Sequence, residues 1–298
     1  MKKHTVTIGI PAYNEEQNIG HLLDCLINQD KANFQLDKII VSSDNSNDDT
    51  VKISKKYKHG KVKVIDNKVR LGQAGRQNQI ISQTSSDILV LLNSDILIEG
   101  DDFIWKLIQP IVENGADLTS SNLKAMPPKS FVGKMLNITL DLRNSIYEKH
   151  KSGQNIYTCH GAARSFSRKF YKKFVFESST AEDAFSYLFC ISSGHKYQYV
   201  SSAVAYIRWP ETLKDHYNQS LRFFQSKEIL YKSFGINAIS DEYRLPKSQI
   251  LSAIIRFFLS HPIEAVAYTS IFLYSAISSL FVKPVNTWKV SGSSKKLI

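Results

Sequence analysis

The sequence lacks several features that mark particular classes of protein. Its three cysteines, Cys25, Cys159 and Cys190, are scattered and form no Cys-x-x-Cys pair, so we expect neither a disulfide framework nor a cysteine-rich metal site. There is no internal repeat and no zinc-finger, RNA-binding or coiled-coil signature, so no nucleic-acid partner is expected despite the net charge of +11. That charge instead suits an anionic membrane surface or phosphorylated small molecules.

The first residues contain no apolar signal-peptide region, because Met1 to Thr5 run directly into a strand pattern. We therefore expect the main domain to stay in the cytoplasm. A chain of 298 residues is long enough to bury a full α/β core, and one domain with an appendage is the natural organisation.

Short apolar runs alternate with segments of helical spacing through the first part of the chain. We predict strands at residues 6–10, 38–41, 62–65 and 88–92, with helices between them. This alternation predicts a doubly wound, mostly parallel sheet flanked by helices. We place one domain at residues 1–240, with halves at about 1–116 and 117–240, and a separate segment at 241–298.

The last segment differs from the rest in composition. Residues 265–282 carry no charge, which is at the lower edge of the roughly 20 residues of a spanning helix. A single span, a hairpin with the apolar residues 250–259, helices lying in the membrane interface and a buried helix all remain open. The lysines that follow, at 283, 289, 295 and 296, favour a cytoplasmic position. We expect association with the cell membrane and a main domain on its cytoplasmic side.

The most informative local feature is Asn93-Ser94-Asp95, which directly follows the apolar run 88–92. In parallel sheets, ligands bind beyond the carboxyl ends of the strands, so Asp95 is delivered to the place where a site forms. A carboxylate there can hold a divalent cation, and the cation can hold a diphosphate. The alternative is a simple turn after a strand.

Five segments, in order, resemble motifs of the family 2 glycosyltransferases, the inverting class with the GT-A fold. They are residues 10–16 (Ile-Pro-Ala-Tyr-Asn-Glu-Glu), 43–50 (Ser-Asp-Asn-Ser-Asn-Asp-Asp-Thr), 93–95 (Asn-Ser-Asp), 182–183 (Glu-Asp) and 219–223 (Gln-Ser-Leu-Arg-Phe). Four features depart from the family pattern. Arg70 and Asn93 replace Asn and Asp, Phe223 stands where tryptophan is usual, and Arg76 falls two residues before Asn78 instead of one.

The resemblance implies a role for each matching position. Donor-binding residues would be Pro11, Tyr13, Glu15, Asp44, Gly72, Arg76, Ser94 and Asp95. Asp95 and Asn93 would hold Mg²⁺ or Mn²⁺, and Asn93 would contribute an amide oxygen without charge. Asp183 would be the general base, with Glu182 orienting the loop or the acceptor. Gly161, Ala162, Gln219 and Arg222 would contact the acceptor.

Simpler explanations exist for several of these residues. Asp44 and Asp48 can cap the helix that begins near Thr50, and Glu182-Asp183 can stabilise a helix N-terminus. Arg70 and Arg76 can either neutralise phosphate or lie on a solvated face.

The expected function is inverting transfer of a sugar from a nucleotide-sugar donor, UDP-linked first and GDP-linked second. The expected acceptor is a lipid-linked or glycan molecule. A catalytically degenerate membrane scaffold and a nucleotidyltransferase are the alternatives.

Overall fold

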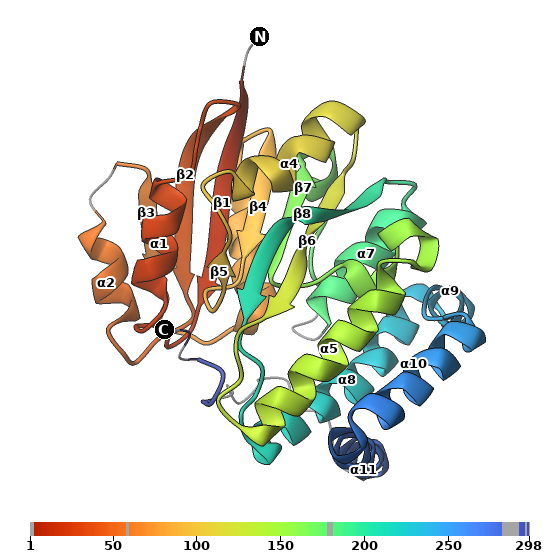
Figure 1. Ribbon diagram of the computed structural model, residues 1–298. Helices are drawn as coiled ribbons and strands as arrows, with labels where there is room; N and C mark the ends of the chain where they lie inside the picture. Colours follow the sequence, from red (N-terminus) through yellow and green to blue (C-terminus); the bar gives the residue numbers. More distant parts are fainter. Residues whose placement is uncertain (1–2, 58–59, 178–180, 282–291, 296, 298) are drawn as a thin grey trace.

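The computed structural model describes residues 3–57, 60–177, 181–281, 292–295 and 297. Within these residues, eight strands form one sheet in the order β3-β2-β1-β4-β7-β6-β8-β5 (Figure 1). The strands are β1 (His4–Ala12), β2 (Phe34–Ser43), β3 (Val62–Asp66), β4 (Ile88–Leu92), β5 (Leu97–Ile98), β6 (Leu118–Ala125), β7 (Ala163–Ser167) and β8 (Tyr197–Ile207). The predicted α/β class is confirmed.

Helices cover the sheet and extend from one end of it (Figure 1). They are α1 (Ile19–Ile27), α2 (Thr50–Lys56), α3 (Gly72–Ser82), α4 (Phe103–Asn114), α5 (Phe131–Tyr147), α6 (Arg168–Tyr171), α7 (Glu182–Ser192), α8 (Leu213–Phe234), α9 (Ile236–Glu242), α10 (Lys247–Ser260) and α11 (Pro262–Ser279). The predicted boundary at residue 240 falls inside α9.

The N-terminal half is the parallel part of the sheet. Strands β2 and β4 both pair with β1 in parallel, and β3 pairs in parallel with β2. All five residues of β4 are buried, as expected for a strand covered on both faces. Gly9 lets α3 lie against the central strand, since a β-carbon there would be 2.4 Å from Ile80 Cγ2. The four strands predicted from the sequence are all present here.

The C-terminal half is mixed. Strand β7 inserts between β4 and β6 and is antiparallel to both, whereas β6 and β8 pair in parallel. This insertion joins the two halves into a single sheet. It also brings residues 160–162, just before β7, beside the end of β4, where Asn93 N donates to Ala162 O at 2.9 Å.

The last two helices of the described residues, α10 and α11, pack on helices α5 and α8. Helices α10 and α11 contact each other, and both contact α5, while α11 also packs along α8. The buried carboxylate of Glu264 forms an ion pair with Lys134 of α5, with Oε1 2.8 Å from Lys134 Nζ. In the described part of the chain, no helix combines the length and apolarity needed to cross a membrane. Residues 282–291, which include the end of the predicted apolar run, lie outside the described residues.

Candidate active site

The candidate site lies at the edge of the sheet where the parallel strands end. The register pairs Ala12, the last residue of β1, with Ser43, the last residue of β2. Strand β4 ends beside them, because Gly9 of β1 pairs with Leu91. The loops that carry Tyr13 to Glu15, Asp44, and Asn93 to Asp95 therefore leave the sheet at one edge, as the sequence predicts.

The loop after β1 is fixed by the loop after β2. Asn14 has a φ of 53°, in the left-handed region that Asn tolerates better than most residues. Its backbone N–H donates to Ser46 Oγ at 3.1 Å, and its Oδ1 accepts from Asn47 N at 2.8 Å. Glu15 N donates to Thr50 Oγ1 at 2.7 Å. Residues 14 and 15 are thus held in position before any ligand arrives.

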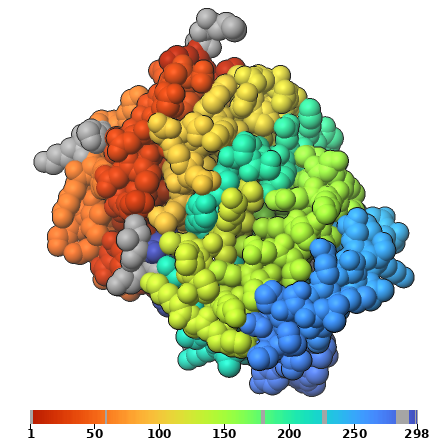
Figure 2. Space-filling model, in the orientation of Figure 1, coloured from red at the N-terminus to blue at the C-terminus, as the bar shows by residue number. Residues whose placement is uncertain are grey.

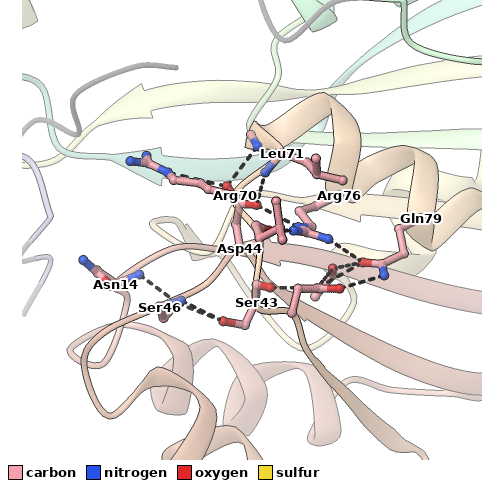
Figure 3. A network of polar contacts seen from close by, with 12 residues as sticks. Asn14, Ser43, Asp44, Ser46, Arg70, Leu71, Arg76 and Gln79 are labelled. Carbon is pink, nitrogen blue, oxygen red and sulfur yellow. Dashed lines mark hydrogen bonds and ion pairs between the residues drawn. The ribbon is translucent and has the colours of Figure 1, made fainter. Parts of the chain in front are cut away.

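Asp44 organises a buried polar network (Figure 3). Its Oδ1 accepts hydrogen bonds from Leu71 N at 2.8 Å and Arg76 Nε at 2.7 Å, and its Oδ2 accepts from Gly72 N at 3.0 Å. Arg70 Nε lies 3.7 Å from Oδ2. The carboxylate therefore holds the start of α3 in place. Among the described residues the Asp44 carboxylate accepts from Leu71, Gly72 and Arg76 and from no N–H group of α2, whereas Thr50 N of α2 donates to Asp48 Oδ1 at 3.1 Å, so helix capping describes Asp48 and not Asp44. The contact of Asp44 with a base stays a prediction.

Arg76 lies beneath the site surface. Its side chain is 3% exposed, and its guanidinium donates to Asp44, to the carbonyl of Val69 and to Gln79 Oε1 (Figure 3). In this arrangement the guanidinium acts on the site through Asp44, and it is neither the phosphate-neutralising group nor the solvated one that the sequence left open. Arg70 is more exposed, and its guanidinium carbon lies 3.7 Å from the centroid of the Tyr13 ring. Tyr13 and Arg70 therefore lie against each other at this edge of the sheet.

The pKa of Asp95 is affected by burial and by two nearby cations. Burial raises its pKa, whereas the nearby cations Lys295 and Arg222 lower it. Asn93 Oδ1 accepts a hydrogen bond from Gln73 Nε2 at 2.9 Å, so its amide oxygen already has a partner. No group of three or more His, Cys, Asp or Glu side chains suited to a metal occurs among the described residues. This donor set fits a cation that arrives with phosphate oxygens, since Mg²⁺ sites commonly combine one or two carboxylates with substrate phosphates.

Glu182 and Asp183 begin helix α7 and face the same space. Burial raises the pKa of Glu182, and the neighbouring Asp183 raises it further, whereas Arg164 and Arg222 lower it. Asp183 Oδ1 accepts from Ala184 N at 2.7 Å. A β-carbon on Gly161 would lie 3.7 Å from both Asp183 Cβ and Glu182 Oε1. The structure thus brings the predicted acceptor segment and the predicted acid pair together.

Arg222 interacts electrostatically with acids from two parts of the site, Asp95 after β4 and Glu182 at the start of α7. Burial lowers its pKa, and the carboxylates of Glu182 and Asp95 raise it again. Its guanidinium therefore lies near both groups, on helix α8. Gln219, three residues earlier, shares that helix face. The weak Gln-x-x-Arg echo in the sequence has marked a residue that the fold places at the site.

Two contributors escaped the sequence analysis. Arg164 is fully buried and donates from Nη1 to Glu182 O at 2.8 Å and to Ser186 Oγ at 2.7 Å, which fixes the start of α7. Lys295 pairs with Glu15 Oε1 at 3.0 Å. Arg164 lies two residues after Ala162, beside the segment expected to contact the acceptor, but nothing in the sequence gave it a role of its own. No spacing rule connects Lys295 with Glu15.

Burial makes Glu15 unusual among these acids. Desolvation and the charge of Asp95 raise its pKa to about 7, against the lowering effects of Lys295 and Asn18. Asn18 Nδ2 donates to Glu15 Oε2 at 2.8 Å. The site therefore contains a carboxyl group that titrates near neutral pH and depends on a lysine for its charge.

The chain is similar to known proteins both in sequence and in fold. The sequence profile of "Glycosyl transferase family 2" matches residues 7–175, more than half of the chain. The chain is 25% identical over 136 residues to UDP-Glc:alpha-D-GlcNAc-diphosphoundecaprenol beta-1,3-glucosyltransferase WfgD of Escherichia coli, covering 46% of this chain and 52% of that protein. It is 31% identical over 147 residues to poly(ribitol-phosphate) beta-glucosyltransferase of Bacillus spizizenii, covering 47% and 23%. The chain thus spans about half the length of these curated relatives, or less.

Solved structures share the fold. A mannosyltransferase from Pyrobaculum calidifontis, in complex with GDP-Man and Mn²⁺, superimposes with a TM-score of 0.60 at 15% identity, covering 95% of this chain and 77% of that chain. Glucosyl-3-phosphoglycerate synthase from Mycobacterium tuberculosis, in complex with Mn²⁺, UDP and phosphoglyceric acid, gives 0.59 at 19% identity, covering 78% and 79%. The GT-A-type fold expected from the sequence is therefore confirmed.

Proposed function

Since the chain belongs to glycosyl transferase family 2, we propose that it transfers a sugar from a nucleotide-sugar donor to an acceptor hydroxyl. The observation that carries the proposal is that the loops bearing Tyr13 to Glu15, Asp44 and Asp95 leave the sheet at one edge. The carboxylates of Asp95 and Glu182 also both raise the pKa of Arg222. UDP-linked donors come first, because the E. coli relative is named for UDP-Glc, and GDP-linked donors come second.

In this proposal the nucleotide lies along the carboxyl ends of β1, β2 and β4. Tyr13 and Arg70 line the nucleoside side, and Asp44 keeps the backbone at Leu71 and Gly72 in place. Mg²⁺ or Mn²⁺, held by Asp95 and assisted by Asn93, would supply positive charge to the diphosphate of the donor. Arg222 adds a second positive charge near Asp95. The departing diphosphate would thus be stabilised as its negative charge develops.

The acceptor would approach from the side of Gly161 and α7. Its hydroxyl oxygen forms a bond to the anomeric carbon while the bond from that carbon to the β-phosphate oxygen breaks. Asp183 takes the hydroxyl proton, and Glu182 and Arg164 hold the loop in position. Attack from the face opposite the diphosphate inverts the anomeric configuration.

We further propose that the acceptor is lipid-linked or a growing glycan at the cytoplasmic face of the cell membrane. The E. coli relative is named for an undecaprenol-linked substrate, and the Bacillus relative for a polymer. The support in this chain is an apolar surface on α10 and α11, the blue corner of Figure 2.

Thirteen of the twenty large apolar side chains that are exposed among the described residues belong to this surface. They are Leu251, Ile254, Ile255, Phe258, Leu259, Ile263, Val266, Phe272, Leu273, Tyr274, Ile277, Leu280 and Phe281. Exposed apolar surface of this extent suits helices lying in a membrane interface. Flotation with vesicles of anionic lipid would test this position: Leu259→Ser combined with Ile263→Ser should reduce binding, and unchanged flotation would contradict it.

Release of nucleoside diphosphate from a panel of UDP- and GDP-sugars, with Mn²⁺, Mg²⁺ or EDTA and a membrane extract as acceptor, tests the proposed reaction. We expect one donor to be used in the presence of metal, and we expect Asp95→Ala to lower turnover by about 10²-fold or more. Donor binding without turnover would support the scaffold alternative, which the engaged amide of Asn93 favours. Release of pyrophosphate would identify a nucleotidyltransferase instead.

A further inference from the structure

The last described residues of the chain fold back onto the nucleotide-binding half. We call residues 293–295 and 297 the tail segment; Figure 1 shows it beside the carboxyl end of β1. Leu297 is 3% exposed, and its carbonyl accepts from Arg208 Nη2 at 3.1 Å. Asn18, at the start of α1, bonds to the tail twice, since it donates to Lys295 O and accepts from Leu297 N at 3.4 Å.

A second set of contacts ties the other end of the tail segment to α8. Ser293 N donates to Asp215 Oδ2 at 3.2 Å, and Ser293 Oγ accepts from Glu211 N at 3.1 Å. The tail segment is therefore held on both sides of Lys295. This double attachment fixes where the lysine side chain enters the site.

The side chain of Lys295 points into the nucleotide-binding loop. Its ammonium group donates to the carbonyl oxygens of Tyr13 and Asn14 and lies 3.0 Å from Glu15 Oε1. Three acceptors thus surround a group that has three N–H donors. The side chain is 18% exposed, and its nitrogen lies 5.7 Å from the centroid of the Tyr13 ring.

The position of this ammonium group matters because of what lies on either side. Tyr13 is on the nucleoside side, and on the other side the positive charge of Lys295 lowers the pKa of Asp95. The space between a nucleoside and the carboxylate that holds its metal is where the diphosphate of a nucleotide sugar must lie. A diphosphate is an anion, so an ammonium group held beside it attracts it through charge, while its three N–H donors stay with Tyr13, Asn14 and Glu15.

We propose that Lys295 is a donor-binding residue, delivered by the tail segment from nearly the other end of the chain. Its ammonium group contributes positive charge to the diphosphate of the bound nucleotide between Tyr13 and Asp95. The proposal rests on the proposed function, because it assigns the residue to the same donor site. It makes the nucleotide pocket a composite of the first loop of the sheet and the last described residues of the chain.

The test is nucleotide binding by the full chain, measured by calorimetry with UDP, GDP and uridine in the presence of Mn²⁺. Lys295→Gln should weaken binding of the preferred diphosphate by about tenfold, the order expected when one positive charge near the diphosphate is lost. Lys295→Arg should restore most of it. Uridine carries no phosphate, so its affinity should stay unchanged in both variants. Lys52→Gln, which removes the same charge from an exposed pair with Asp49, is the matched control.

Salt and a second variant separate charge from architecture. The affinity of the wild-type chain for the diphosphate should fall more steeply with ionic strength than that of Lys295→Gln, because one screened attraction is missing in the variant. Leu297→Ser keeps the lysine but removes the buried anchor of the tail segment, so it should also weaken diphosphate binding.

Three results would overturn the proposal. Unchanged diphosphate affinity in Lys295→Gln, with the wild-type chain binding normally, would remove the role of the lysine and leave the proposed function intact. Tighter binding by Lys295→Gln would identify the tail segment as a plug that competes with the donor. Absence of nucleotide binding by the wild-type chain itself would refute the proposed function, and the role of Lys295 with it.

Discussion

The buried pair of Asp44 and Arg76 offers the sharpest test of how the site is built. Their side chains are 6% and 3% exposed, and the carboxylate accepts from Arg76 Nε, Leu71 N and Gly72 N. In Asp44→Asn, one oxygen becomes an amide group that cannot accept, so at least one buried donor loses its partner. Arg76 keeps a positive charge with no carboxylate beside it.

The expected cost follows from these contacts. Breaking a buried pair by removing one partner typically costs about 3–5 kcal/mol, since an uncompensated charge stays in the interior. We therefore expect Asp44→Asn to lower the free energy of unfolding by about that amount. In an Arg76→Met background, Asp44→Asn no longer leaves the Arg76 charge unpaired in the interior, so the same change should cost less by at least about 2 kcal/mol.

Equilibrium unfolding in urea of the wild type, both single variants and the double variant measures this coupling. Asp241→Asn is the matched control, because its pair with Arg244 is 70% and 78% exposed and should contribute less than about 1 kcal/mol. A cost for Asp44→Asn as small as that of Asp241→Asn, or additive effects in the double variant, would refute the interpretation that Asp44 holds the start of α3.

Two further predictions address catalysis and pH. Asp183→Asn should keep donor affinity while lowering turnover roughly 10²- to 10⁴-fold, as measured by calorimetry and product release; normal turnover would exclude Asp183 as the base. Burial lowers the pKa of His216 to about 4, whereas an unfolded histidine titrates near 6.5. Between these values the unfolded chain binds more protons, so stability falls as pH drops through this window, by on the order of 3 kcal/mol for this one group. His216→Phe should lose less stability than the wild type between pH 7 and pH 4.5 in urea titrations, and an equal loss would contradict the assignment.

Local pattern was enough to predict the parallel half of the fold and the edge that carries the site. The strand of residues 88–92 was predicted with the bounds it has in the structure, because five consecutive apolar residues between polar turns have few other solutions. Once the strands alternate with helices, the residues after each strand must meet at one edge. Asp95 was found in this way, whereas Tyr13 and Asp44 were assigned to the site by the resemblance to family 2 glycosyltransferases.

Other parts of the site depend on contacts that no local pattern encodes. The sequence left open whether Arg76 faces phosphate or solvent, but helix α3 turns it inward, where it donates to Asp44 and to the carbonyl of Val69. Helical periodicity tells which residues share a face, but packing against β1 decides which face is buried. The antiparallel insertion of β7 is likewise set by the assembled sheet, and it brings Gly161 to Asp183.

The sequence by itself determined the family, the class of fold and the carboxylates at the ends of the strands, because these follow from short-range order and from ordered motifs. Only the tertiary structure decided that Lys295 meets Glu15 and that Arg222 lies near both Asp95 and Glu182. These contacts join residues far apart in the chain. Their partners are selected by chain folding and by the need of buried charges for opposite charges, and neither leaves a spacing that can be read along the sequence.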